Sequence, residues 1–226
     1  MPTLSVATRR LFTRTTLAFA CFCLCAISFI ALADEIHENS TTEFDDNILR
    51  FINSFSSSAG DTVFVWLTHL GGILFIPLIT AAFCALFWRN GKQEKAAILA
   101  VSVGGAALLN LLVKQLFERS RPELWEQLVT EHSFSFPSGH AMISSALAFA
   151  LILLFWSTAY RAYAIILGSI YMLTIGFSRL YLGVHYPTDV LGGWLLSMAW
   201  VSIVWFVWKS KHQSNPITKA KLLPKK

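Results

Sequence analysis

The sequence predicts an all-α integral membrane protein, a bundle of six transmembrane helices with both termini on the cytoplasmic side. Three observations predict it: a shortage of charged residues, six long apolar runs, and an uneven distribution of lysine and arginine. Of the 226 residues, 55% are apolar and 14% are charged, whereas a soluble domain carries about 25% charged residues. The composition therefore excludes a water-soluble globule, a disordered chain and a disulfide-stapled secreted scaffold.

Six apolar runs have about the length needed to cross a bilayer. A hydrocarbon core of about 30 Å requires about 20 residues of helix. Because backbone polar groups in hydrocarbon must bond within their own segment, we expect each run to form a helix. The runs that contain no Asp, Glu, Lys or Arg are Thr15–Ala33, Thr62–Trp88, Ala96–Val113, Ala141–Tyr160, Ala162–Ser178 and Val190–Trp208.

The charged residues between the runs predict the orientation. With six crossings, thirteen of the 18 Lys and Arg residues fall on the side of the N-terminus, and twelve of the 13 acidic residues fall on the opposite side. Cytoplasmic segments of membrane proteins are enriched in Lys and Arg, so both ends are predicted to be cytoplasmic. The net charge of +5 is then a signal of topology, and we expect no nucleic acid partner.

The chain divides into four parts. Residues 1–33 hold the N-terminus and the first helix; their basic start and their Ala31-Leu32-Ala33 end also resemble a secretory signal with a cleavage site. An uncleaved anchor is favoured, because the run is long enough to span. Residues 34–60 are a polar outer loop with a short amphipathic helix expected around residues 44–55. Residues 61–208 are the core with five helices, and residues 209–226 are a basic tail, expected to be disordered near anionic lipid headgroups.

Ionisable residues gather where the third to sixth runs reach the outer face. Such residues are costly near a membrane unless they serve a site, a water-filled cavity or an interface. Cationic groups suit phosphate oxygens, arginine by its planar fork and lysine as a point charge. A pocket for a tetrahedral dianion beside two imidazoles is therefore predicted, formed by Lys114, Arg121, His140, Arg179, His185 and Asp189.

The spacing of these residues matches a known pattern. The three parts are Lys114-x6-Arg121-Pro122, Pro137-Ser138-Gly139-His140 and Ser178-Arg179-x5-His185-x3-Asp189. This pattern resembles, without a missing position, the three-part signature of the type-2 phosphatidic acid phosphatases, also called lipid phosphate phosphatases. The resemblance implies a membrane enzyme that hydrolyses phosphate from a lipid.

The resemblance also implies roles for the matching residues. His185 would be the nucleophile that forms a phosphohistidine, Asp189 would orient its ring, and His140 would be the general acid. Ser138 and Gly139 would bind phosphate at a helix start, and Lys114, Arg121 and Arg179 would hold its other oxygens.

No cofactor is expected, and no metal, because a carboxylate cluster that would bind magnesium is absent from this face. Two other residues of the same outer segment, Arg119 and His132, lie outside the signature. We expect both to be solvated loop charges.

The location of the pocket predicts the class of substrate. Catalytic residues at the level of the headgroups favour a lipid phosphomonoester or diphosphate, of the undecaprenyl diphosphate or phosphatidylglycerophosphate type. The chain is then expected in a bacterial cytoplasmic membrane, with its active site facing the periplasm or the exterior. Two alternatives remain open: a lipid phosphotransferase that uses the same intermediate, and a non-catalytic protein that binds lipid phosphates. No particular oligomeric state is predicted.

Overall fold

The computed structural model describes residues 6–214, and every regular element in that range is an α-helix. The all-helical prediction is therefore confirmed for the described part of the chain. The helices are α1 (Val6–His37), α2 (Thr42–Asn53), α3 (Ser58–His69), α4 (Phe75–Arg89), α5 (Gln93–Phe117), α6 (Gly139–Phe155), α7 (Arg161–Tyr181) and α8 (Pro187–Ser214).

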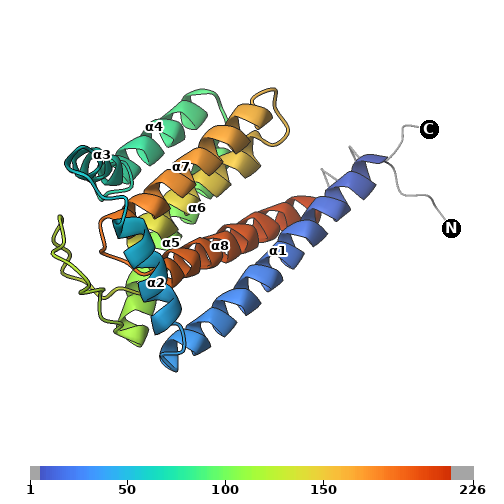
Figure 1. Cartoon of the computed structure of the whole chain (residues 1–226). Coiled ribbons are helices and arrows are strands. Elements are labelled where there is room, and N and C mark those ends of the chain that lie inside the picture. Colours follow the sequence, from blue (N-terminus) through green and yellow to red (C-terminus); the bar gives the residue numbers. More distant parts are fainter. Residues whose placement is uncertain (1–5, 215–226) are drawn as a thin grey trace, which may run out of the picture.

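Helix α6 forms the centre of the bundle and packs against α5, α7 and α8 (Figure 1). It carries several small side chains, and Ala141, Ser144 and Ala146 are fully buried. Small residues let neighbouring helices approach closely, which is how membrane bundles pack. On the other side of α8, helix α1 runs beside it over much of its length. The bundle therefore has a tightly packed centre and a more open flank.

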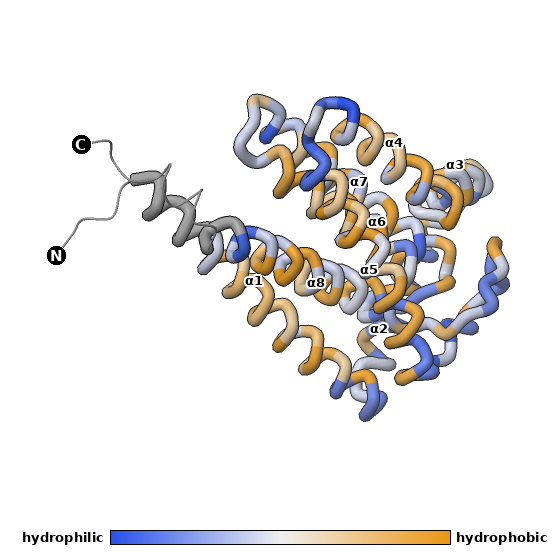
Figure 2. Tube along the Cα trace, turned by 180° about the vertical axis from the view of Figure 1, so that it is seen from behind, coloured by the Kyte–Doolittle hydropathy of each residue, from blue (hydrophilic) through white to orange (hydrophobic). Residues whose placement is uncertain are grey.

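The helices are apolar along their length, and hydrophilic residues lie mainly at their ends and in the connections (Figure 2). Within the described residues, four helices are long and apolar enough to cross a membrane: Thr15–His37, Gln93–Phe117, Arg161–Tyr181 and Pro187–Lys211. The apolar helices α4 and α6 are shorter. A membrane protein is confirmed, while six crossings stay a prediction.

One predicted helix is broken. The apolar run from Thr62 to Trp88 forms two helices, because α3 ends at His69 and α4 begins at Phe75. The chain turns between them at Gly71, where an added Cβ would lie 2.5 Å from the side chain of Ile175. Pro77 lies in the first turn of α4, where its missing amide hydrogen is tolerated. Hydropathy alone did not reveal this break, since every residue across it is apolar or neutral.

The structure also bears on predictions for the segments outside the core. The expected amphipathic helix of the outer loop is confirmed as α2, which buries Leu49 and Ile52 and exposes Phe44 and Phe51. The tail prediction was wrong for residues 209–214, which continue α8; residues 215–226 lie outside the described residues. Helix α1 continues through Ala33 to His37, and the uncleaved anchor stays a prediction.

The residues predicted to carry the chemistry lie at one end of the bundle. At this end α5 and α7 finish, α6 and α8 begin, and α2 and α3 lie beside them (Figure 1). The long loop 118–138 contacts the α7–α8 turn. Trp125 of the loop packs so closely on Gly183 of the turn that a Cβ added at Gly183 would lie 2.6 Å from the indole. Gly183 also has a φ of +68°, a conformation that favours glycine. The loop and the turn thus form one surface around the site.

Candidate active site

His185 and Asp189 form a buried pair at the start of α8. His185 lies in the α7–α8 turn, and Asp189 lies in the first turn of α8, four residues later. The Nδ1 atom of His185 is 3.4 Å from Oδ2 of Asp189. The same oxygen accepts hydrogen bonds from the Ser135 hydroxyl and, at 2.8 Å, from the backbone N–H of Tyr186. These donors hold the carboxylate with one oxygen toward the imidazole.

Arg121 shows which nitrogen of the neutral His185 ring carries the lone pair. Its Nη1 atom lies 3.2 Å from Nε2 of His185. A guanidinium can only donate, so Nε2 is the acceptor and the proton of the neutral ring lies on Nδ1, which faces Asp189. Burial, followed by the positive charges of Arg121 and Arg179, lowers the pKa of His185 well below its usual value. The ring is therefore neutral at pH 7, and its Nε2 lone pair accepts from Arg121.

His185 is one of the residues that line a cavity of about 580 Å³. The cavity extends between α4 and α5, where its walls are apolar and include Ile76, Val103 and Ala107. Its other end is lined by five of the predicted site residues, namely Lys114, Arg121, Gly139, His140 and His185. The cavity thus joins a charged end with two imidazoles to a long apolar groove.

The three other predicted residues, Ser138, Arg179 and Asp189, are not among those that line the cavity. Asp189 contacts it through His185. Arg179 is 1% exposed and donates to Thr68 Oγ1 at 2.7 Å, while its Nη2 pairs with Glu131, which does line the cavity. The Nε of Arg179 and the hydroxyl of Ser138 are buried without a hydrogen-bond partner among the described residues. Both groups remain available to a further acceptor.

The start of α6 is fixed to the start of α8 by the main chain. The backbone N–H of Ser138 donates to the carbonyl of Asp189 at 3.0 Å. Gly139 follows, and a Cβ there would lie 3.1 Å from Oδ1 of Asn110, which is tighter than most contacts. The first amides of a helix have no partner within the helix and can bind an anion. His140 therefore enters the cavity from a helix start that suits phosphate.

Glu131 is a site residue that sequence reasoning missed. Its carboxylate pairs with Arg179 and lies 3.7 Å from Arg121. Burial alone would raise the pKa of Glu131, but these two guanidinium groups outweigh burial and lower it. A charged carboxylate therefore neutralises the arginines at the mouth of the cavity. Its position in a loop without periodicity gave no signal of this contact.

The family model of the PAP2 superfamily matches residues 95–213, which contain all eight predicted site residues. The chain belongs to the PAP2 superfamily. Phosphatidylglycerophosphatase B of Bacillus subtilis is 37% identical over 177 residues, which cover 75% of this chain and 86% of that protein. An undecaprenyl-diphosphatase of Sulfolobus acidocaldarius is 30% identical over 169 residues, covering 71% and 76% of the two chains.

Solved structures agree with this PAP2 membership. The crystal structure of a transmembrane PAP2-type phosphatidylglycerolphosphate phosphatase from Bacillus subtilis matches with a TM-score of 0.76 at 28% identity. The match covers 86% of this chain and 98% of that one. Aquifex aeolicus LpxE shares the fold, with a TM-score of 0.60 at 23% identity over 72% of this chain and 94% of that one.

One prediction about this PAP2 chain was wrong. Arg119, expected to be a solvated loop charge, has a side chain only 13% exposed and forms ion pairs with Asp45 at 2.8 Å and Asp189 at 2.6 Å. The physical reason is that two buried carboxylates need a cation, and Arg119 is the residue between them. By contrast, His132 is exposed, as expected.

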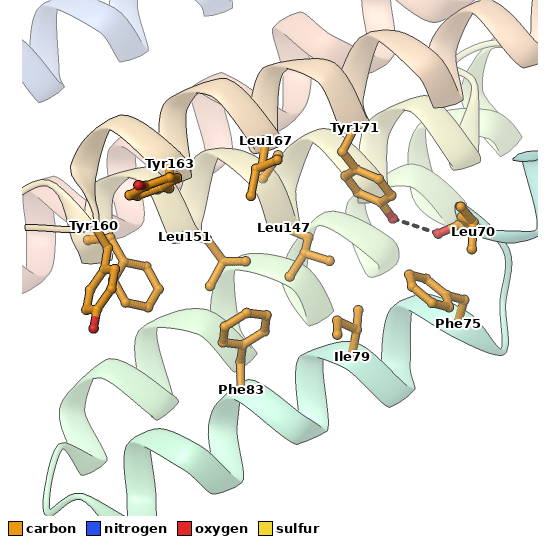
Figure 3. Close-up of a pocket in the computed structure, with 14 residues that line it drawn as sticks. Leu70, Phe75, Ile79, Phe83, Leu147, Leu151, Tyr160, Tyr163, Leu167 and Tyr171 are labelled. Carbon is orange, nitrogen blue, oxygen red and sulfur yellow. Dashed lines mark hydrogen bonds between the residues drawn. The ribbon is translucent and has the colours of Figure 1, made fainter.

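A second cavity of about 530 Å³ lies between α4, α6 and α7 (Figure 3). Its walls are apolar and aromatic, and the Tyr171 hydroxyl donates to the Leu70 carbonyl at 2.7 Å at one end. None of the predicted site residues lines it. The cavity with the ionisable end is therefore the candidate active site of this PAP2 protein.

Proposed function

We propose that this chain hydrolyses a phosphomonoester or diphosphate carried on a membrane lipid, of the phosphatidylglycerophosphate or undecaprenyl diphosphate type. The observation that carries the proposal is the neutral, buried His185, whose Nε2 meets Arg121 at the charged end of an apolar groove. The two PAP2 relatives described above carry these substrates in their names. The groove suits a lipid tail, and the charged end suits its phosphate.

The reaction takes two displacements, a mechanism general to the PAP2 family. In the first, Nε2 of His185 attacks phosphorus, the bond from phosphorus to the lipid oxygen breaks, and His140 gives its proton to that oxygen. In the second, His140 takes a proton from water, the water oxygen attacks phosphorus, and the P–N bond breaks. Phosphate leaves, and both histidines return to their starting states. Asp189 holds the Nδ1 proton and stabilises the cation on the ring.

The remaining site residues hold the phosphate rather than react. Lys114 and Arg121 line the cavity and would meet its oxygens directly. The unpartnered Arg179 Nε and Ser138 hydroxyl would supply two more donors, with Gly139 allowing close approach. Phosphoryl transfer depends mainly on such positioning and charge stabilisation. Because these groups already supply positive charge, we expect no metal in the reaction.

The placement in the membrane is part of the proposal. We infer that α1, α4, α5, α6, α7 and α8 all cross the bilayer. At 1.5 Å per residue, α4 and α6 span only about 23 and 26 Å, which bilayer thinning can accommodate. The distribution of Lys and Arg supports cytoplasmic termini, with the active site on the periplasmic or outer face of a bacterial inner membrane.

Phosphate release from a panel of lipid phosphates in detergent tests this function. We expect activity in excess chelator and inhibition by orthovanadate, which resembles the five-coordinate transition state. A strict requirement for added magnesium would contradict the metal-free mechanism. Release from no lipid phosphate would overturn the function itself. With labelled donor, label found on an acceptor lipid instead of in free phosphate would identify a transferase.

A bulky residue in the groove tests whether it holds the lipid tail. Gly104 lines the groove on α5, and a Cβ there meets no atom within 4 Å. Gly104→Phe is therefore expected to raise the KM for long-chain lipid phosphates by about tenfold, equivalent to about 1.4 kcal/mol. The KM for a short, water-soluble phosphomonoester should not change.

Leu108→Phe is the matched control for this substitution. Leu108 is exposed on the same helix and does not line the groove, so the same ring there should leave both KM values unchanged. Equal effects of Gly104→Phe on long and short substrates would argue against a tail in this groove.

A further inference from the structure

Arg119 connects the outer helix α2 to the catalytic pair. Its Nη2 pairs with Asp45 of α2 at 2.8 Å, and its Nη1 pairs with Asp189 at 2.6 Å. These contacts join parts of the chain that lie 74 and 70 residues from Arg119. The guanidinium also lies over the ring of Tyr186, 4.3 Å from its centroid. One planar side chain thus bridges the outer segment and the start of α8.

The two oxygens of Asp189 have separate partners. Oδ1 accepts from Arg119, whereas Oδ2 faces His185 and accepts from Ser135 and the Tyr186 amide. Arg119 therefore holds the carboxylate from the side away from the imidazole. The main chain of Arg119 also contributes. Its carbonyl accepts from the N–H of Ser135 at 2.8 Å, and the Ser135 hydroxyl donates to Oδ2 of Asp189.

Asp45 holds Arg119 in this position. Asp45 is fully buried, and its oxygens accept from the Thr188 backbone N–H at 3.0 Å and the Thr188 hydroxyl at 2.6 Å. The Thr188 hydroxyl in turn accepts from Arg119 at 2.8 Å. If Arg119 moved away, two buried carboxylates would lose their cation, which is strongly unfavourable. The guanidinium is therefore held between two buried carboxylates, Asp45 and Asp189.

Arg119 does not line the cavity, whereas Arg121, two residues later, does. We propose that Arg119, held by Asp45, is a positioning residue that fixes the Asp189 carboxylate in the orientation that holds the His185 ring. This inference rests on the proposed phosphatase function. It assigns the two neighbouring arginines different tasks, since Arg121 meets the phosphate and Arg119 acts only through Asp189.

The inference is tested by kinetics of purified variants with a lipid phosphate that the wild type hydrolyses. Arg119→Gln should lower kcat by about 100-fold, the cost of a small misplacement of reacting groups, and leave KM within about twofold. Arg119→Lys keeps the charge but not the planar fork, so it should recover part of the loss. Asp45→Asn should lower kcat by about tenfold, since it removes the charge that holds Arg119.

Two exposed residues of α2 serve as matched controls: Arg50→Gln and Glu43→Gln should leave kcat unchanged. The decisive measurement is the double variant Arg119→Gln with Asp189→Asn. If Arg119 acts through Asp189, the double variant is no slower than Asp189→Asn alone. Multiplied losses in the double variant, or a raised KM with unchanged kcat in Arg119→Gln, would overturn the inference and leave the phosphatase function intact.

Thermal unfolding in detergent separates a loss of fold from a loss of positioning. If Arg119→Gln does not fold, kcat is compared between the wild type and the variants Asp45→Asn and Arg119→Lys. Wild-type kcat in both variants would overturn the inference. A wild type that releases phosphate from no lipid phosphate would instead overturn the proposed function, and the inference with it.

Discussion

His185→Ala is expected to lower phosphate release by at least about 10⁴-fold, because it removes the proposed nucleophile of the covalent intermediate. The protein should still fold, since the ring is neutral and the partners of its three side-chain contacts, Arg121, Ser135 and Asp189, keep other hydrogen bonds. Release from a radiolabelled lipid phosphate measures the loss. Rapid quenching in alkali, where a phosphohistidine survives, should show label on the wild type and none on the variant.

The exposed His132 provides the control for this experiment. His132→Ala removes an imidazole from the same end of the bundle and should retain both phosphate release and the labelled intermediate. Normal turnover by His185→Ala with any lipid phosphate would rule out the nucleophile proposed here.

His140→Ala has the second largest expected effect. Loss of a general acid lowers kcat by about 10²- to 10⁴-fold when the leaving group is a lipid alkoxide, which needs a proton to depart. With p-nitrophenyl phosphate the leaving group departs unaided, so the first displacement should remain fast. The second displacement still lacks its base, and the variant should therefore give a burst of about one p-nitrophenol per active site, followed by slow turnover.

Stopped-flow absorbance measures this burst directly. Equal losses for the lipid and the nitrophenyl substrate, without a burst, would show that His140 does not protonate the leaving group. The His132→Ala variant again serves as the control, with unchanged rates for both substrates.

Helices α5 to α8 could be predicted from the sequence because each carries a long apolar run between charged ends. The prediction of one helix over Thr62–Trp88 was wrong, because the break in this run depends on how closely Gly71 approaches Ile175 of α7. That contact joins residues far apart in the sequence, so no local pattern reports it. Hydropathy therefore located the apolar helices but not the turn between α3 and α4.

The residues of the signature were predictable for a related reason. His185 and Asp189 are four residues apart, and Ser138, Gly139 and His140 are consecutive, so their geometry is largely local. Arg119 and Asp45 were missed because their pairing spans 74 residues and one of them lies on a helix outside the apolar core. The burial of a charged residue can be predicted only when its partner from another segment is known.

The main-chain hydrogen bond from Ser138 to Asp189 has a consequence for how such enzymes diverge. It links the first turns of the helices that carry His140 and Asp189, and it involves no side chain. The separation of the turns that carry His140 and Asp189 is thus set by the main chain and not by the side chains of the exposed part of loop 118–136. Positions of that loop other than Arg119, Arg121, Glu131 and Ser135 can therefore vary without changing the spacing of the reacting groups.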